Sequence, residues 1–260
     1  MNDQFVNEQF DDWKNESVAE TRRRLRRSWG DYPLTILILN PINIRLARLL
    51  GHTLITPNQI TVISFMLTIL ASILIASNRW GLQSAGGAVL LIAYLFDCLD
   101  GDLARLKGLK SPLGAMLDPM LDRFGEFAIC VGISINGWYL TKDYKWLIGG
   151  MVLVGMSQIY FYLVDAMLKK LPEVQKPLRT IRQFEIKGTI VRIGAIEPFI
   201  WGQAGLSFLG VAHWGVIIFG VMFSIGSIGE LFRIIIEARN MVAIESERYG
   251  THLRCSKFNK

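Results

Sequence analysis

The sequence predicts an all-α integral membrane protein with six transmembrane helices, preceded by an amphipathic helix that lies in the membrane interface. The 260-residue chain is 51% hydrophobic, and its mean hydropathy of +0.33 is higher than that of an ordinary soluble domain. The apolar residues gather in stretches of about 20, the length that a helix needs to cross about 30 Å of hydrocarbon. The expected spans cover 58–77, 85–106, 116–140, 146–168, 188–210 and 213–238.

The interfacial helix is expected over residues 34–50, directly before the first span. Ile42, Leu46 and Leu49 fall on one helical face, whereas Arg45 and other polar residues lie elsewhere. This segment is too charged to cross a bilayer, and it suits a helix whose apolar face lies in lipid and whose arginines lie near phosphates. A plain cytosolic connector is the alternative.

Lys and Arg residues are distributed unevenly between the two expected sides of the membrane. The outer loops contain only Arg79, Lys142 and Lys145. Because short translocated loops avoid positive charge, both termini and the active site are expected in the cytoplasm. The basic residues on the cytoplasmic side are Arg22, Arg23, Arg24, Arg26, Arg27, Arg45, Arg48, Lys107, Lys110, Lys169, Lys170, Lys176, Arg179, Arg182, Arg239 and Arg248.

The net charge of +6 reflects this asymmetry and an attraction to anionic lipid headgroups in the bilayer. The basic run RRRLRR at 22–27 lacks interleaved aromatic residues and precedes a membrane domain, so nucleic acid is not an expected partner. The spacing of the three cysteines is not that of a disulfide framework or a metal site.

We expect one membrane domain over residues 34–240, between a polar cytoplasmic extension at 1–33 and a cytoplasmic tail at 241–260. The first 30 residues lack the apolar core of a secretory signal peptide, so targeting is assigned to the first span.

Acidic residues interrupt two otherwise apolar helices within residues 95–127. Asp97 and Asp100 are three residues apart, and Asp118 and Asp122 are four apart, so each pair projects from one face of its helix. Burying four aspartates would cost roughly 10 kcal/mol if nothing compensated their charge. Carboxylates that converge from two antiparallel helices suit hard divalent cations, so two Mg²⁺ or Mn²⁺ ions are expected.

Other interpretations of these aspartates fit less well. The sequence lacks the Asp-x-Asp-x-Asp-Gly pattern and the closing Glu of a calcium loop. Arg105 and Arg123 are too few to neutralise four carboxylates by ion pairing. A cation-coupled transporter is the alternative class of protein, because transporters also carry carboxylates in membrane helices. Its site would be expected near the membrane midplane, whereas these aspartates gather at one membrane face.

The region resembles the signature of the CDP-alcohol phosphotransferase family at every fixed position. The matching residues are Asp97-x2-Asp100-Gly101-x2-Ala104-Arg105-x8-Gly114-x3-Asp118-x3-Asp122. The segment Thr56-Pro57-Asn58-Gln59, followed by Thr61, also resembles the family's Pro-Asn-x-x-Thr stretch at the start of the first span. The family is known for six transmembrane helices with an interfacial helix before the first, the layout that the hydropathy pattern predicts independently.

The resemblance implies the roles of individual residues. Asp97, Asp100 and Asp118 are expected to bind two divalent metal ions, while Asp122 contacts a metal ion and acts as the general base. A carboxylate in this role is reasonable because an alcohol is a weak nucleophile at neutral pH. The positions that match contacts to the CDP part of the donor are Thr56, Pro57, Asn58, Gln59, Gly101, Arg105 and Ser111.

The expected reaction is the transfer of a phosphoalcohol group, favoured as phosphatidyl, from a CDP-alcohol to an acceptor hydroxyl with release of CMP. The product would be a phospholipid and CDP-diacylglycerol the donor; a soluble donor such as CDP-inositol or a CDP-amino alcohol is the alternative. Lys187 and Arg192 are expected to bind an acceptor phosphate, although Arg192 could instead pair with Glu197. The resemblance also suggests a homodimer, and it leaves the identity of the acceptor open.

Overall fold

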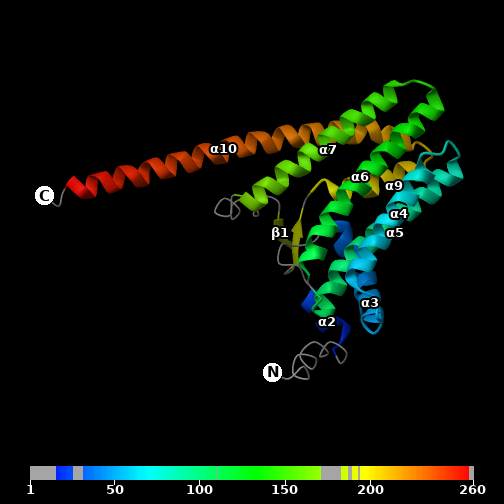
Figure 1. The fold of residues 1–260 in the computed structure, drawn as a ribbon, viewed down its shortest axis with the longest axis horizontal. Coiled ribbons are helices and arrows are strands. Elements are labelled where there is room, and N and C mark those ends of the chain that lie inside the picture. Colours follow the sequence, from blue (N-terminus) through cyan, green and yellow to red (C-terminus); the bar gives the residue numbers. More distant parts are fainter. Residues whose placement is uncertain are drawn as a thin grey trace.

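The structure, a computed structural model, describes residues 16–25, 32–109, 111–170, 183–186, 189–192 and 194–257. It describes no side chain between 165 and 193, and almost none beyond 236. Within the described part, long helices pack in a bundle, and the C-terminal part of the last helix projects away from it (Figure 1). The bundle contains α4 (Pro57–Ile75), α5 (Trp80–Lys107), α6 (Pro112–Thr141), α7 (Lys145–Lys170), α9 (Ile196–Phe208) and α10 (Gly215–Lys257).

Small residues let neighbouring helices of the bundle approach closely, as is usual where helices pack in membranes. A Cβ atom on Gly132 of α6 would lie 2.6 Å from the carbonyl oxygen of Ser72 in α4. Ser72 itself donates a hydrogen bond of 2.5 Å to the carbonyl oxygen of Ala128 in α6. These contacts hold α4 against α6, while α4 also packs along α5, the helix that begins the acidic signature.

Four of the expected spans are confirmed as helices long and apolar enough to cross a membrane. They are Pro57–Ile75, Trp80–Lys107, Lys145–Val164 and Ala212–Ile236. The third expected span, 116–140, is also helical and lies within α6, but this helix contains several ionisable residues and is not among the four. At 13 residues, α9 is about 20 Å long, which is shorter than a membrane core.

The boundary expected for the fifth span is wrong at its start. Residues 189–192 form strand β2 (Thr189–Arg192), which pairs antiparallel with β1 (Gln183–Ile186), and helix α9 begins only at Ile196. A hydropathy window does not distinguish a strand from a helix, and the sequence Thr-Ile-Val favours extended backbone because these residues are β-branched.

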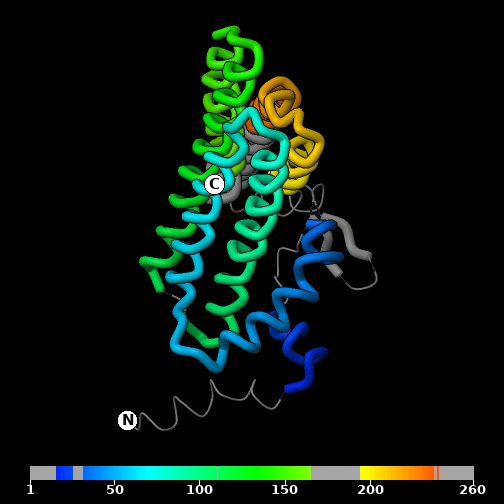
Figure 2. The backbone as a smooth tube through the Cα atoms, turned by 90° about the vertical axis from the view of Figure 1, so that its right-hand side faces the viewer, coloured from blue at the N-terminus to red at the C-terminus, as the bar shows by residue number. Residues whose placement is uncertain are grey.

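The segment expected as an interfacial helix contains a π-helical turn, η2 (Thr35–Leu39), followed by α3 (Asn40–Gly51). Pro41 occupies the first turn of α3, where its missing N–H is tolerated. Figure 2 shows α3 at the foot of the bundle, running at an angle to the long helices. Ile44 and Ala47 are buried against α5, whereas Leu37 and Leu49 are exposed.

The start of this segment is fixed by a carboxylate from the other half of the chain. Glu197 in α9 accepts hydrogen bonds from the backbone N–H of Leu34 at 3.1 Å and of Thr35 at 2.6 Å. The Thr35 hydroxyl also donates to Glu197 and lies 3.1 Å from the Tyr94 hydroxyl of α5. Because Glu197 is buried, this network joins the foot of the bundle to α5 and α9.

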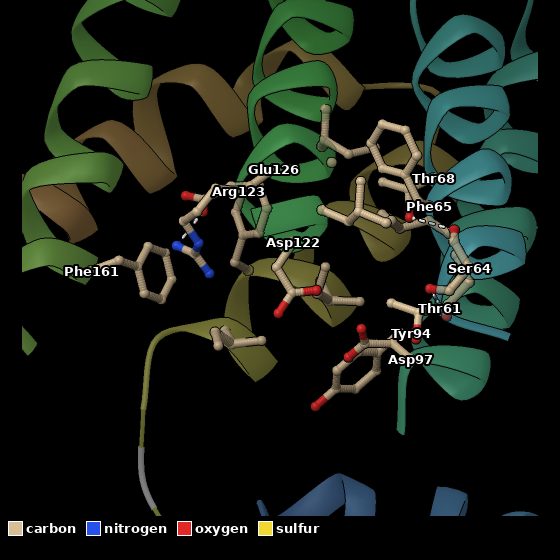
Figure 3. A pocket seen from close by; sticks show the side chains of 18 residues that line it. Thr61, Ser64, Phe65, Thr68, Tyr94, Asp97, Asp122, Arg123, Glu126 and Phe161 are labelled. Carbon is tan, nitrogen blue, oxygen red and sulfur yellow. Dashed lines mark hydrogen bonds and ion pairs between the residues drawn. The ribbon is translucent and has the colours of Figure 1, made fainter. Parts of the chain in front are cut away.

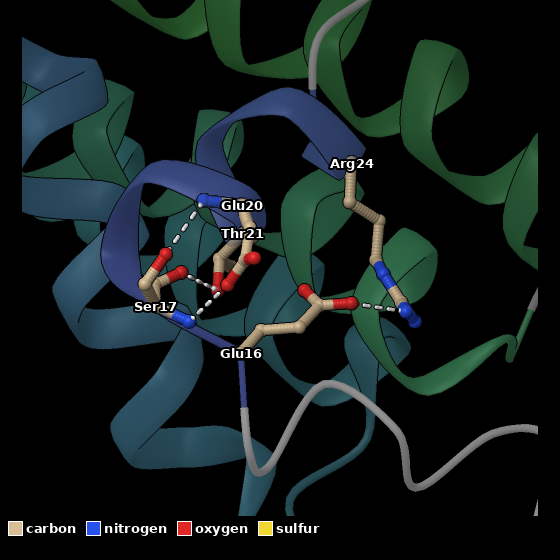
Figure 4. Close-up of polar contacts among 5 residues, drawn as sticks. All are labelled: Glu16, Ser17, Glu20, Thr21 and Arg24. Atoms are coloured by element: carbon tan, nitrogen blue, oxygen red, sulfur yellow. Dashed lines mark hydrogen bonds and ion pairs between the residues drawn. The ribbon is translucent and has the colours of Figure 1, made fainter.

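The expected polar extension contains a short helix, α2 (Val18–Leu25), that packs on α3 and α5. Ser17 and Glu20 form a reciprocal capping box at its start (Figure 4): the Ser17 N–H donates to Glu20 at 2.6 Å, and the Glu20 N–H donates to Ser17 at 3.3 Å. The Ser17 hydrogen bonds lower the pKa of Glu20. At the other end, Leu25 is buried in the apolar cluster that contains Leu103.

Candidate active site

Two consecutive helices, α5 and α6, bring the acidic residues of the signature together. Helix α5 ends at Lys107 and is followed by Gly108, whose left-handed backbone (φ 67°) terminates the helix. Helix α6 starts after Ser111, whose hydroxyl accepts a hydrogen bond of 3.0 Å from the N–H of Gly114. As a result, one carboxylate oxygen each from Asp97, Asp118 and Asp122 lies within 4.8 Å of the other two.

Asp100, which is not one of these three, contacts α4 through one oxygen of its carboxylate. Its carboxylate accepts a hydrogen bond of 2.5 Å from the hydroxyl of Thr61 in α4. Asp100 is buried, and together with Asp118 it lines a cavity at the end of the bundle where α5 meets α6. The fourth aspartate of the signature is therefore adjacent to the other three and is oriented by a side chain that the signature does not contain.

The cavity beside Asp100, here called the Gly101 cavity, has a volume of about 240 Å³. Five of the residues expected to contact CDP line it: Pro57, Asn58, Gly101, Arg105 and Ser111. The other two, Thr56 and Gln59, form the capping box of α4, in which the Thr56 N–H donates to Gln59 at 2.9 Å. The structure thus places Thr56 and Gln59 where they shape the α4 terminus, and they are not among the lining residues.

Two glycines of the signature contribute to this cavity in different ways. A Cβ on Gly114 would lie 2.7 Å from the side-chain oxygen of Asn58, so glycine allows Asn58 to pack over the start of α6. A Cβ on Gly101 would be at an ordinary 3.6 Å from the Arg105 guanidinium. The absence of a Gly101 side chain therefore mainly leaves space on the cavity wall.

Three residues outside the seven expected contacts hold the cavity wall in place. Thr61 orients Asp100, as described above, and Asp102 pairs with Arg105 three residues further along α5. Lys107 donates to the carbonyl oxygens of Thr53 at 2.7 Å and Ile55 at 2.8 Å, so it ties the loop before α4 to the end of α5. The position of Thr61 could be predicted from the sequence, because Thr61 follows Pro57 by one helical turn. The sequence contains no pattern that predicts the hydrogen-bond partners of Lys107.

A second cavity, here called the Asp122 cavity, lies deeper in the bundle and has a volume of about 100 Å³ (Figure 3). Asp97 and Asp122 line it from α5 and α6, together with Tyr94. Apolar side chains from α4, α5, α6, α7 and α9 form most of the remaining wall; they include Phe65, Leu90, Ile129, Phe161, Phe199 and Ile200. The aspartates therefore stand between two cavities, one at the end of the bundle and one inside it.

The donor set of the three converging aspartates fits a divalent metal ion. Carboxylate oxygens are the ligands that Mg²⁺ and Mn²⁺ prefer, and Asp97, Asp118 and Asp122 offer them within a space that one ion can bridge. The expected acceptor-binding cations are not part of this geometry: Lys187 lies outside the described residues, and only the backbone of Arg192 is described, in β2.

The family model of CDP-alcohol phosphatidyltransferases matches residues 54–225. This range includes both cavities and the whole signature, and the chain belongs to this family. It is 32% identical over 117 residues to an archaetidylinositol phosphate synthase of Pyrococcus horikoshii, a match that covers 45% of this chain and 58% of the relative.

The fold is also shared with solved structures of a phosphatidylinositol phosphate synthase of Mycobacterium tuberculosis. The structure with CDP-DAG bound superposes with a TM-score of 0.55 at 21% identity, covering 74% of this chain and 92% of that one. The complex with manganese and citrate gives a TM-score of 0.54 at 23% identity, covering 73% and 87%. At these identities the likeness establishes the common fold.

Proposed function

We propose that this protein transfers a phosphatidyl-type group from a CDP-alcohol to an acceptor hydroxyl and releases CMP, in phospholipid biosynthesis. The observation that carries the proposal is the position of Asp97, Asp118 and Asp122, which converge within 4.8 Å between the Gly101 cavity and the Asp122 cavity. Two substrates can approach such a centre from two sides, as a transfer reaction requires.

The nucleotide of the donor is assigned to the Gly101 cavity. Arg105 presents a planar set of donors suited to phosphate oxygens, and its pairing with Asp102 holds it on the cavity wall. Asn58 and Ser111 add polar groups, while Gly101 leaves space for the ligand. Thr56 and Gln59 support this site through the α4 terminus.

The acceptor is assigned to the side of Asp122. The Asp122 carboxylate takes the proton of the acceptor hydroxyl, whose oxygen forms a bond to the phosphorus distal to cytidine. The bond between that phosphorus and the oxygen of CMP breaks, and CMP leaves. The apolar wall of the Asp122 cavity limits the entry of water, which would otherwise compete as the acceptor.

Two divalent metal ions, Mg²⁺ or Mn²⁺, would be held by Asp97, Asp100, Asp118 and Asp122. When bound, they supply positive charge that neutralises the pyrophosphate and stabilises the departing CMP. Thr61 contributes by holding the Asp100 carboxylate in one orientation.

The names of the relatives support particular substrates. A solved relative contains CDP-DAG, so we assign CDP-diacylglycerol as the donor. Two of the relatives are named archaetidylinositol phosphate synthase and phosphatidylinositol phosphate synthase. Their names favour an inositol phosphate as the acceptor. The chain spans 58% of the length of the first of these relatives and 44% of the second. Lys187 and Arg192 stay candidates for binding the acceptor phosphate on sequence grounds.

The proposal includes the membrane arrangement. Helices α6 and α9 join the four apolar helices to give six spans; because α9 is shorter than the membrane core, the bilayer is locally thinned around it. The segment formed by η2 and α3 lies in the interface with Leu37 and Leu49 toward lipid. Both termini and the Gly101 cavity face the cytoplasm. Residues 34–240 form the membrane domain, flanked by the extension 1–33 and the tail 241–260, and the protein acts as a homodimer.

The proposal is tested with detergent-purified protein, Mg²⁺ or Mn²⁺, and a panel of substrates. CDP-diacylglycerol with inositol phosphate is expected to yield CMP and a phosphatidylinositol phosphate, identified by mass spectrometry. A second arm offers CDP-inositol with a lipid alcohol, and product there alone would replace the lipid donor by a soluble one. If no pair of donor and acceptor gives metal-dependent CMP release, and proteoliposomes that contain the protein show a cation flux, the transporter alternative is established.

A further inference from the structure

We infer that Glu126 recognises a second hydroxyl of the acceptor, so that this enzyme selects a polyol; this inference rests on the proposed function. Glu126 lies one helical turn beyond Asp122 on α6 and lines the same cavity (Figure 3). It is 8% exposed, yet its Oε1 atom is buried with no hydrogen-bond partner. A buried carboxylate oxygen without a donor is costly, and a ligand in the cavity would supply one.

The other oxygen of Glu126 is occupied by Arg123. The Arg123 guanidinium donates to Oε2 of Glu126 at 2.7 Å. The central carbon of the same guanidinium, Cζ, lies 3.7 Å from the centroid of the Phe161 ring. Ion pairing on one side and stacking on the other fix the carboxylate plane. Arg123 is thus a positioning residue that leaves Oε1 for a ligand.

Ser157 in α7 is a further hydrogen-bonding neighbour of the Glu126 carboxylate. Its hydroxyl carries a single proton and also lies 3.0 Å from the carbonyl oxygen of Val154. Because a carboxylate has about four acceptor sites, Arg123 and Ser157 together leave Glu126 able to accept a hydrogen bond from a ligand.

The chemistry of Glu126 defines the class of ligand. The pairing with Arg123 favours the ionised form of Glu126, and an ionised carboxylate only accepts hydrogen bonds, so its partner must be a donor such as a hydroxyl. Side chains four residues apart on a helix are about 5–6 Å apart at their Cβ atoms. Asp122 and Glu126 can therefore contact two hydroxyls of one small polyol, with Asp122 at the nucleophilic oxygen and Glu126 at a neighbouring one.

The test compares Glu126→Gln with the wild type, using inositol phosphate and its monodeoxy analogues as acceptors and CDP-diacylglycerol as donor. The variant is expected to raise the KM for inositol phosphate at least tenfold and to leave the KM for the donor unchanged. Binding of radiolabelled inositol phosphate to the purified protein should weaken by the same factor. With the wild type, kcat/KM for one monodeoxy analogue should be about tenfold lower than for inositol phosphate. With Glu126→Gln, kcat/KM for that analogue should equal kcat/KM for inositol phosphate.

Glu230→Gln is the matched control, because Glu230 is also buried and paired with an arginine three residues away, Arg233, but lines neither cavity. It should leave both KM values unchanged. If Glu126→Gln does not fold, Glu126→Asp withdraws the carboxylate by one methylene and should also raise the acceptor KM.

An acceptor KM within twofold of wild type, or equal losses with every monodeoxy analogue in both proteins, would overturn the role of Glu126 while leaving the transfer reaction intact. If the wild type itself releases no CMP with any acceptor, the proposed function fails.

Discussion

Gly114 shows how a single residue of the signature acts through its neighbour. The side chain of Asn58 occupies the space where a Cβ of residue 114 would stand, at 2.7 Å. Since Asn58 lines the Gly101 cavity, the conformation of its amide depends on the absence of a side chain at position 114.

Gly114→Ala is therefore expected to displace Asn58 and to weaken the site for the donor nucleotide. We expect the KM for CDP-diacylglycerol to rise about tenfold, which corresponds to about 1.4 kcal/mol, with little change in the acceptor KM. Steady-state kinetics with each substrate varied in turn would measure this.

The control for this variant is Gly155→Ala in α7, because among the described residues no atom outside the local helix backbone lies within 4 Å of a Cβ at position 155. That substitution should leave both KM values unchanged and stabilise the helix by up to about 1 kcal/mol. Equal donor KM values for Gly114→Ala and wild type would show that the Asn58 position is unimportant.

At the scale of elements, the loop before α4 depends on the end of α5. Lys107 donates to the Thr53 and Ile55 carbonyl oxygens, and the next residues along the chain, including Pro57 and Asn58, line the Gly101 cavity. The start of α4 and the end of α5 thus both contribute to the cavity wall, and Lys107 joins them.

Lys107→Met is expected to remove both hydrogen bonds while retaining much of the side-chain length. Hydrogen bonds to charged groups contribute about 1.5–3 kcal/mol each, so the loop should loosen and the donor KM should rise several-fold. Hydrogen exchange of residues 52–58 should quicken in parallel. Lys145→Met at the opposite end of the bundle, where the side chain is 78% exposed, should alter neither quantity.

The sequence anticipated the elements near the aspartates better than those after α7. The three- and four-residue spacing of Asp97, Asp100, Asp118 and Asp122 needs only helix geometry, and the structure brings three of the four together. The β1–β2 hairpin was missed because hydropathy does not resolve a short strand from a helix start.

Contacts between distant parts of the chain could not be predicted from the sequence. The Glu197 carboxylate accepts hydrogen bonds from the N–H groups of Leu34 and Thr35, which lie 163 and 162 positions earlier in the chain. Neither spacing nor charge pattern reveals such a pair, because it depends on how α9 packs against α5. The same holds for Lys107 and its carbonyl partners, which are 52 and 54 positions away.

At the scale of the whole molecule, the end of the bundle opposite the aspartates is rich in aromatic residues. Trp80, Trp138, Tyr139 and Trp146 lie beside the turns that join α4 to α5 and α6 to α7. Lys142 stands over the rings of Trp138 and Tyr139 at 5.3 and 5.0 Å. Aromatic residues concentrate at both membrane interfaces, which supports placing this end at a membrane surface. The small number of Lys and Arg residues in its loops predicts that this surface is the outer one.

This orientation predicts which positions a membrane-impermeant maleimide can reach in intact cells. Cys98 and Cys130 are buried, so with Cys255 replaced by serine the background should be low. Cysteine at Asn78 or Tyr144, both exposed in the turns between helices, should be labelled from outside. A cysteine at position 109, where Leu109 is exposed at the aspartate end, should react only after the cells are opened. Labelling of Leu109→Cys in intact cells would show that the protein has the opposite orientation in the membrane.

The most direct test of the central claim is the effect of Asp122→Asn on metal-dependent CMP release. The amide keeps the size of the side chain but cannot take the proton of the acceptor, so kcat is expected to fall about 10²–10⁴-fold while binding of CDP-diacylglycerol is largely retained. Asp143→Asn, in the turn before α7, should behave as wild type. Turnover by Asp122→Asn at the wild-type rate, with folding and donor binding intact, would contradict the account.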